Sequence, residues 1–178
     1  MSDAFARIIA EKGLRVPSVV ARFHAADTGR YRGSAKVEGG NFVARLIARL
    51  VGFPPPRLTV DFEITTAPQG EGHLWSRRFG RNTTTSYLRY DNRRHCAVES
   101  FGPIRIEMGL RMQGEGLAVD VLRICVLGIP LPVWLTPRSA SSEFETSQGY
   151  FGFDISASLP GVGLLVRYQG SFEVPMPR

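Results

Sequence analysis

The feature that most constrains this chain is an alternation of apolar and polar residues that begins at Leu58. Its first segment places Leu58, Val60, Phe62 and Ile64 at every second position, with threonine, aspartate and glutamate between them. Because successive side chains of a β-strand point to opposite faces, a period of two predicts a strand with one buried face. We therefore expect residues 57–174 to form an antiparallel β meander.

Turn-forming residues interrupt this alternation about every 8–12 residues, a spacing typical of meanders. The turns fall at Pro68–Gly70, Gly80–Asn82, Asp91–Asn92, Gly102–Pro103, Gly114–Gly116 and Pro160–Gly161, and strands are predicted at His73–Phe79, Thr83–Tyr90, His95–Phe101, Ile104–Met112, Leu117–Val126, Phe151–Leu159 and Leu164–Val174. A long meander has two unpaired edges, and closure into a barrel removes both. The predicted fold is mainly β: a barrel or strongly curved sheet of about eight or nine strands, with two or three N-terminal helices.

Within one predicted strand the alternation slips by one residue. The two apolar sets that are out of phase are Leu117, Val119 and Val121, and then Leu122, Ile124 and Val126. Such a slip would turn every later side chain to the wrong face unless the strand accommodates an extra residue. We predict a β-bulge near Val121.

Residues 1–52 are predicted to be a mostly helical flank of the same single domain, 1–178. Asp3 can cap a first helix that ends at Gly13, Pro17 can open a second, and Arg30–Glu38 alternates weakly, as a strand would. Asn41 can cap a stronger amphipathic helix, which stops at Gly52 before a run of three prolines. Its apolar positions are Phe42, Val43, Leu46, Ile47, Leu50 and Val51, with Arg45 and Arg49 opposite.

The chain is basic, with a formal net charge of +6, and all of its 22 basic residues except Lys12 and Lys36 are arginine. Guanidinium groups bind carboxylate and phosphate well, but these arginines are scattered among 16 acidic residues. One basic hairpin, with aromatic residues among its arginines, would suit single-stranded nucleic acid. Its residues are Trp75, Arg77, Arg78, Arg81, Tyr87, Arg89, Tyr90, Arg93 and Arg94. Since no nucleic-acid-binding motif accompanies them, we expect a solvated face and no nucleic-acid partner.

The sequence carries no catalytic, metal-binding or nucleotide-binding motif, so we expect no metal and no cofactor. Cys96 and Cys125 are predicted to be small core residues, because two cysteines make neither a disulfide framework nor a zinc site. His24, His73 and His95 lack the spacing of a metal site or a relay and are expected at or near the surface. The amino terminus lacks the apolar run of a signal peptide, and no apolar run approaches the ~20 residues that span a bilayer. A reducing cytoplasm is the expected location.

The segment Trp75–Phe79 is the sharpest local feature. On a strand Trp75, Arg77 and Phe79 share one face, and the two aromatic residues suggest that this face is the inner one. A buried arginine must meet a carboxylate, a carbonyl or a bound anion. One interpretation is that Arg77 holds the headgroup of a ligand, with Glu99 or Glu107 nearby. The other is that Arg77 lies on Trp75 as an internal plug with its own counter-ion.

The segment 127–135, Leu-Gly-Ile-Pro-Leu-Pro-Val-Trp-Leu, is almost wholly apolar. Its alternating prolines exclude a helix or an interior strand. It is expected to fold over the core as a lid, and the alternative is an exposed patch that docks on a membrane or a protein. Trp134 is the natural anchor in either case.

An ordered set of short motifs resembles a bacterial family of unknown function, domain-of-unknown-function family 4166. The motifs are Arg30–Gly33, Leu50–Pro54, Trp75–Phe79, Glu99–Pro103, Leu127–Pro132 and Tyr168–Phe172, and the resemblance covers nearly everything after about residue 17. Members stand alone or follow a saccharopine-dehydrogenase-like NAD-binding domain. The resemblance therefore implies a role beside an NAD-binding oxidoreductase partner, with this chain as the standalone form, and it supplies no catalytic residues.

Three functional hypotheses follow. The first is a non-enzymatic module that binds an apolar or amphipathic small molecule or a lipid inside the barrel, with Arg77 orienting the polar end. The expected ligand-binding residues are Trp75, Arg77, Phe79, Glu99, Met108, Leu110, Trp134, Phe153 and Tyr168. The second is a cyclase- or isomerase-like enzyme that uses Arg77 with Glu99, Glu107 or Asp120 as acid and base. The third is a domain that docks on a protein or membrane through residues 127–135.

Overall fold

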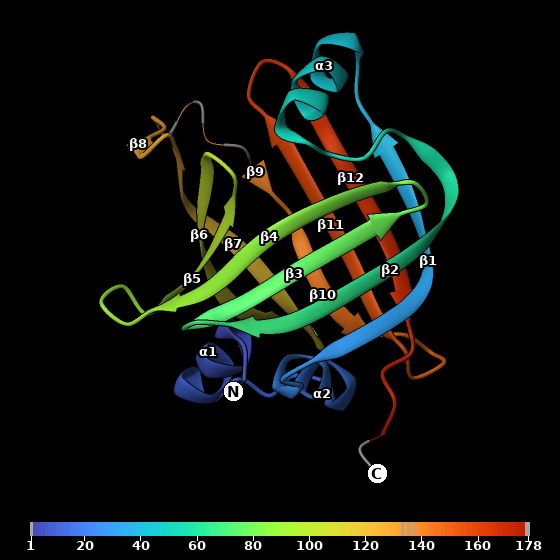
Figure 1. Ribbon diagram of the computed structural model, residues 1–178, viewed down its shortest axis with the longest axis vertical. Coiled ribbons are helices and arrows are strands. Elements are labelled where there is room, and N and C mark those ends of the chain that lie inside the picture. Colours follow the sequence, from blue (N-terminus) through green and yellow to red (C-terminus); the bar gives the residue numbers. More distant parts are fainter. Residues whose placement is uncertain (1, 133, 135, 137, 177–178) are drawn as a thin grey trace.

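The computed structural model describes residues 2–132, 134, 136 and 138–176, and within them the chain forms three helices and a single twelve-stranded sheet (Figure 1). In chain order the elements are α1 (Ala4–Lys12), α2 (Ser18–Ala25), β1 (Gly29–Gly39), α3 (Phe42–Val51), β2 (Arg57–Gln69), β3 (Gly72–Phe79), β4 (Asn82–Asp91), β5 (Cys96–Phe101), β6 (Ile104–Gln113), β7 (Gly116–Val126), β8 (Ile129–Pro130), β9 (Arg138–Ser139), β10 (Ser141–Glu145), β11 (Phe151–Leu159) and β12 (Gly163–Phe172).

Ten of the described strands close into an antiparallel barrel. The hydrogen-bonded order runs from β1 to β7, continues through β10, β11 and β12, and returns to β1. The two-residue strands β8 and β9 lie beside β7 and β11. The prediction of a mainly β, meander-built barrel is confirmed, although the ring has more strands than the eight or nine expected. The extra strand is β10, whose sequence Ser-Ser-Glu-Phe-Glu has too few apolar residues to show an alternation.

The slip of phase in β7 is absorbed as predicted. Glu107 pairs with Arg123 and Met108 pairs with Val121, so Leu122 is the extra residue of a β-bulge. The bulge leaves Leu122 exposed and lets Val121 and Ile124 both line the interior. Apart from Leu122 itself, the two apolar sets of β7 therefore belong to one inner face.

Leu58 departs from the expected pattern. Val60, Phe62 and Ile64 are buried as predicted, but the side chain of Leu58 is 83% exposed. The register of β1 and β2 shifts between Ala35 and Val37. The segment of β2 that lies opposite these residues is one residue longer than the segment of β1. This irregularity turns Leu58 away from the core.

The helices cover the two ends of the barrel (Figure 1). Asp3 caps α1 by accepting from the amides of Phe5 and Ala6, and Gly13 ends it in the left-handed conformation. Helix α2 begins directly after Pro17 and packs with α1 at one end. Helix α3 lies at the other end, between β1 and β2 in sequence, capped by Asn41 and ended by Gly52. The capping residues Asp3 and Asn41, and the start of α2 after Pro17, agree with the sequence prediction.

Helix α3 exposes most of its large apolar side chains, which is unexpected for an amphipathic helix. An amphipathic helix ordinarily buries its apolar stripe, yet α3 rests on the barrel through the buried residues Ala44 and Ala48. A Cβ at Gly40 would lie 1.9 Å from the carbonyl oxygen of Leu164, so the start of this segment lies very close to β12. The large apolar side chains that remain exposed are Phe42, Val43, Leu46 and Leu50.

Aromatic rings fill the barrel at the end covered by α1 and α2. Phe23 of α2 is at the centre, with its ring centroid 4.6 Å from that of Phe151 and 5.3 Å from that of Phe172. The rings of Phe62 and Phe153 extend the cluster toward the middle of the barrel, with centroids 4.8 Å apart. This packing leaves the free interior space toward the end that carries α3.

Candidate functional site

The barrel contains a partly open cavity of about 350 Å³ below α3. Its wall is formed by the inner faces of β5, β6, β7, β11 and β12, and it is almost entirely aliphatic or aromatic. Ile47 of α3, Phe53 and Leu131 border it at the α3 end. The volume lies in the range of about 300–1,000 Å³ found for small-molecule pockets.

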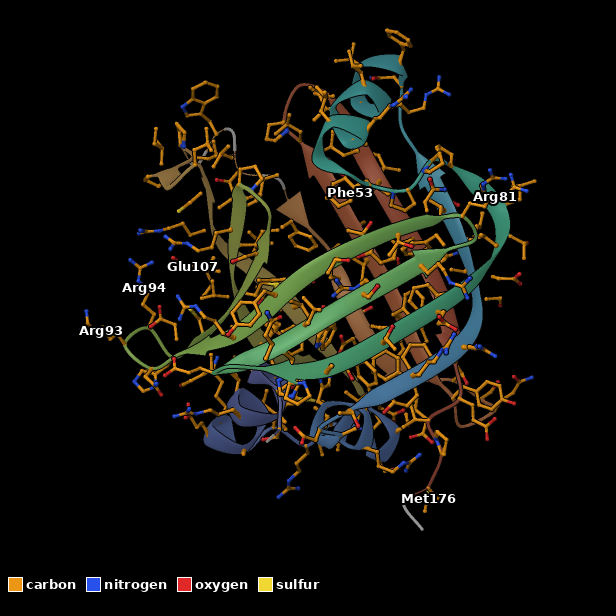
Figure 2. The ribbon with its side chains drawn as sticks, in the orientation of Figure 1. Phe53, Arg81, Arg93, Arg94, Glu107 and Met176 are labelled. Carbon is orange, nitrogen blue, oxygen red and sulfur yellow. The ribbon has the colours of Figure 1, made fainter. Side chains whose placement is uncertain are left out.

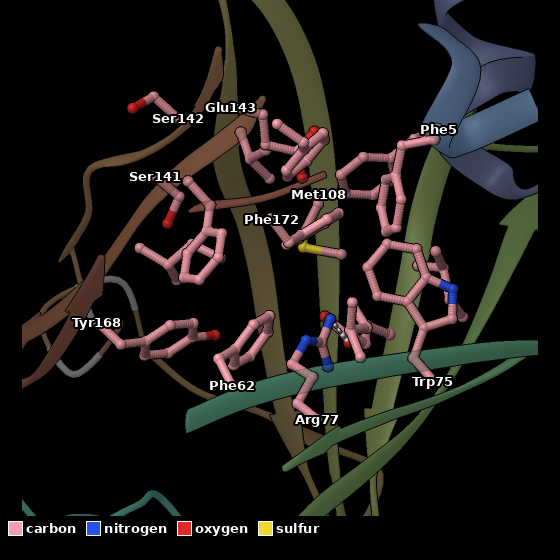
Figure 3. A pocket seen from close by; sticks show the side chains of 18 residues that line it. Phe5, Phe62, Trp75, Arg77, Met108, Ser141, Ser142, Glu143, Tyr168 and Phe172 are labelled. Carbon is pink, nitrogen blue, oxygen red and sulfur yellow. Dashed lines mark hydrogen bonds and ion pairs between the residues drawn. The ribbon is translucent and has the colours of Figure 1, made fainter. Parts of the chain in front are cut away.

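A smaller space of about 90 Å³ continues this cavity toward the aromatic cluster (Figure 3). The two spaces share the lining residues Glu99, Met108, Val119, Ser141, Ile155 and Tyr168. A molecule in the larger cavity would therefore meet, at its inner end, the polar side chains that border the smaller one.

Arg77 of β3 is the centre of these polar groups (Figure 3). Its Nη2 donates to Glu99 Oε1 at 2.9 Å, and its Nη1 donates to Ser86 Oγ at 3.0 Å. The Ser86 hydroxyl donates in turn to the same carboxylate oxygen at 2.6 Å. A guanidinium has five N–H donors, and the hydrogen bonds to Glu99 and Ser86 use two of them, while Arg77 itself lines the small space.

Arg77 also stacks on Trp75, with its Cζ 4.8 Å from the ring centroid. Both features of the internal-plug interpretation, a tryptophan beneath the guanidinium and a counter-ion beside it, are present. The arrangement also leaves Arg77 at the edge of a cavity. Being a plug and orienting a ligand are thus compatible roles for this side chain.

Tyr168 of β12 points its hydroxyl into the interior (Figure 3). Burial raises the pKa of this phenol, so the hydroxyl stays protonated at neutral pH. Among the hydrogen bonds of the described residues, none engages it. Tyr168 is therefore a neutral donor and acceptor available to a guest molecule.

The predicted site residues separate into three groups. Trp75, Arg77, Glu99, Met108, Phe153 and Tyr168 come together around the two spaces. Phe79 and Leu110 are buried in the core cluster beside them, without lining either space. Trp134 lies apart on the surface, with 70% of its side chain exposed.

Two carboxylates considered for acid–base chemistry lie outside the barrel. Ile106 and Met108 face the cavity, so Glu107 between them points outward, where it pairs with Arg94 and, at 3.9 Å, with Arg123. Asp120 pairs with Arg111 on the same outer surface at 2.8 Å. The expectation that either could act with Arg77 is wrong, because strand alternation separates them by the thickness of the wall.

The segment 127–135 does not cover the core with its apolar side chains, contrary to the lid expectation. Leu127, Ile129 and Trp134 are exposed, and Leu131 alone among its described residues lines the cavity. Val133 and Leu135 lie outside the described residues. The loop borders the cavity and directs most of its apolar surface outward.

A buried charged cluster was missed by the sequence analysis. His24 has no exposed surface, and its ring donates from Nδ1 to Asp3 Oδ2 at 2.8 Å and from Nε2 to Glu143 Oε2 at 2.7 Å. Burial opposes the charged ring, but the two carboxylates outweigh it and raise the pKa of His24 to about 10. His73 is also buried, so the surface expectation is wrong for both and fits only His95. Helical spacing was the sequence signal that could have indicated the burial of His24. This residue follows the buried Val20 by four positions and so lies on the same face of the helix.

The geometry thus defines a class: an antiparallel β-barrel with an apolar interior cavity and one internal cluster of polar groups. The chain belongs to the family described as domain of unknown function DUF4166, whose model matches residues 16–172. This confirms the resemblance seen in the sequence. None of the curated proteins matches the chain.

A comparison with solved structures finds a match to a protein of unknown function of the DUF3598 family from Nostoc punctiforme. It is 14% identical, with a TM-score of 0.40, and the match covers 82% of this chain and 47% of that one. The chain thus spans about half the length of this structure. Among the described residues, no helix is long and apolar enough to cross a bilayer, and no three histidine, cysteine or acidic side chains lie together as metal ligands would.

Proposed function

We propose that this protein is a non-enzymatic module that binds a small apolar or amphipathic molecule inside its barrel. The cavity of about 350 Å³ carries the proposal, because an apolar wall with a few polar groups at one end is the usual form of a small-molecule site. Its volume equals that of roughly a dozen water-sized groups. The apolar part of the guest would lie among β5, β6, β7 and β11.

The polar end of the guest would meet Arg77 and Tyr168 at the inner end of the cavity. Arg77 would donate with the N–H groups that Glu99 and Ser86 leave free, and Tyr168 would donate or accept. A carboxylate, sulfonate or hydroxyl group suits these partners. The buried, free thiols of Cys96 and Cys125 are consistent with the reducing cytoplasm that we propose as the location.

The alternative is a cyclase- or isomerase-like enzyme that uses Arg77 with Glu99. A general base requires a carboxylate free to accept a proton. Glu99 instead accepts from both Arg77 and Ser86, and Glu143, the other carboxylate at the small space, is paired with the charged His24. These pairings favour binding. The NAD-binding oxidoreductase partner implied by the family resemblance stays part of the proposal as a consumer or supplier of the guest.

Two measurements test the proposal. Native mass spectrometry of protein purified from a bacterial host should reveal a bound apolar molecule. A fluorescence titration with anilinonaphthalene sulfonate, whose rings and anionic group match the cavity, should give saturable binding. Ala157→Phe adds a ring to the cavity wall and should weaken dye binding at least tenfold, by roughly the ~1.4 kcal/mol that a tenfold change represents.

Thr85→Phe is the matched control, because Thr85 is exposed on the outer face of β4. It should bind the dye as the wild type does. A clean apo mass together with dye binding that is absent, or equal in both variants, would overturn the proposal.

A further inference from the structure

The exposed apolar face of α3 lies at the same end of the barrel as the exposed residues Leu127, Ile129 and Trp134. In an antiparallel ring every second connection lies at the same end, so the β1–β2 connection that contains α3 and the β7–β10 connection that contains β8 share one end (Figure 1). Both border the same cavity, through Ile47, Phe53 and Leu131. We call this end of the barrel, with its described residues in 40–56 and 127–140, the mouth.

The mouth exposes large apolar side chains from both connections. In α3 the side chains of Phe42 and Leu50 are 75% and 80% exposed, and those of Val43 and Leu46 are about half exposed. On the other side Leu127, Ile129 and Trp134 are each mostly exposed. Isolated exposed apolar residues are common, but two clusters that flank one cavity indicate a surface that contacts something.

The charges of the mouth are of one sign. None of the 16 acidic residues falls in the five connections at this end, residues 40–56, 80–81, 102–103, 127–140 and 160–162. The same connections contain Arg45, Arg49 and Arg81, which line one surface hollow beside Phe53. Figure 2 shows Phe53 and Arg81 at this end of the molecule.

Arg45 and Arg49 also stand on the exposed side of α3. At about 100° per residue, Arg49 lies roughly 20° from Phe42 on the helix, whereas Arg45 lies roughly 60° away, on the flank between Phe42 and the buried Ala48. A helix that carries phenylalanine and leucine beside arginine is typical of one that lies in the interface of an anionic bilayer. A tryptophan such as Trp134 is also characteristic of that depth, since its ring is apolar and its N–H is polar.

We propose that the mouth docks on the surface of an anionic phospholipid bilayer. The apolar side chains would enter the interface and the arginines would contact lipid phosphates, which places the cavity directly beneath the lipid. Docking would give an apolar guest a path between bilayer and barrel that avoids water. This reason for docking rests on the proposed binding function, but the docking itself is measured without a guest.

Co-sedimentation with vesicles tests the proposal. The full chain should bind phosphatidylcholine vesicles that contain about a third phosphatidylglycerol, should bind pure phosphatidylcholine weakly, and should dissociate at high salt, because salt screens the arginines. Brominated lipid should quench the emission of Trp134, and Trp134→Phe should remove that signal, since Trp75 is buried in the barrel.

Two variants of the mouth should each reduce binding at least tenfold: Phe42→Ser with Leu50→Ser, and Arg45→Glu with Arg49→Glu. Each basic residue near an anionic membrane surface strengthens binding severalfold, so the loss of two arginines should weaken it more than tenfold. All four side chains are exposed, so folding, checked by circular dichroism, should be unchanged. Met176→Ser and Arg93→Glu are the controls, because both residues are exposed and lie away from the mouth (Figure 2).

The outcomes are distinct. Absence of vesicle binding at low salt, or equal binding by mouth variants and controls, would overturn the docking proposal. So would a dimer, seen by sedimentation, that the Phe42→Ser and Leu50→Ser variant abolishes, because then a second copy occupies the surface. Ala157→Phe separates the two proposals: it should keep full vesicle binding while losing the dye.

Discussion

His24 Nε2 lies 2.7 Å from Glu143 Oε2, and this contact joins helix α2 to β10, the strand that closes the barrel. The other ring nitrogen holds Asp3, the N-cap of α1. One buried imidazolium thus connects both N-terminal helices to β10, without which the barrel would not be closed. Its removal should affect the whole barrel.

His24→Gln should destabilise the protein by roughly 3–5 kcal/mol, the usual effect of removing one member of a buried ionic group. The carboxylates of Asp3 and Glu143 would then remain buried without the cation that lies between them. Urea unfolding monitored by circular dichroism measures the change. His95→Gln is the matched control, since that ring is 74% exposed, and it should change stability by less than about 0.5 kcal/mol. Equal midpoints for the two variants would contradict this role of His24.

The stabilising effect of His24 should decrease as the pH becomes alkaline. Its pKa is about 10 in the folded protein against 6.5 for an ordinary histidine, so the unfolded chain releases the proton first as the pH rises. The contribution is fully present below pH 6.5 and is lost progressively as the pH rises through 10. Unfolding midpoints of wild type and His24→Gln should therefore converge between these values. A gap that stays constant to pH 10 would show that the ring is neutral.

Arg77→Met should cost roughly 3 kcal/mol or more, because Glu99 would be left in the interior without its cation. The double variant Arg77→Met with Glu99→Gln should recover much of that loss, since neither charge remains. Unfolding free energies of the two single variants and the double variant form a cycle. Simple additivity of the two single effects would mean that Arg77 and Glu99 do not stabilise each other.

Deletion of Leu122 should be tolerated, whereas deletion of Val119 should not. Leu122 is the extra residue of the bulge, so without it Val121 still faces inward and Arg123 outward. We expect a loss of about 1–2 kcal/mol from the change in strand curvature. Deletion of Val119 instead reverses the faces of neighbouring residues. Soluble expression and near-ultraviolet circular dichroism distinguish the two, and equal behaviour would contradict the assigned register.

The local signals in the sequence predicted most of the fold. Alternation, turns and caps each depend on neighbouring residues, so nine of the ten barrel strands, the caps Asp3 and Asn41 and the bulge near Val121 could be located without knowledge of the tertiary structure. Strand β10 could not, because Phe144 is the one apolar residue within it and its position depends on pairing with β7 and β11. Its pairing is a property of the closed ring.

The candidate site could be predicted only in part, because contacts between distant strands leave no local signal in the sequence. The inward direction of Arg77 followed from its aromatic neighbours on β3, but its partner could be narrowed only to Glu99 or Glu107. The arrangement of strands in the closed barrel decides between these two glutamates. Glu99 lies on the inner face of β5 and Glu107 on the outer face of β6. The exposed apolar side of α3 was unpredictable from its periodicity, since the pattern shows that a helix has two faces and not which one meets the sheet.

The short length of β10 has a consequence for how the barrel moves. It is held by three paired positions to β7 and by four to β11, whereas β6 and β7 share ten. Thermal fluctuations that part neighbouring strands should therefore begin along this seam, and its amides should exchange with deuterium before those of the long hairpins. The wall beside Ser141, which borders both interior spaces, would be the first to open.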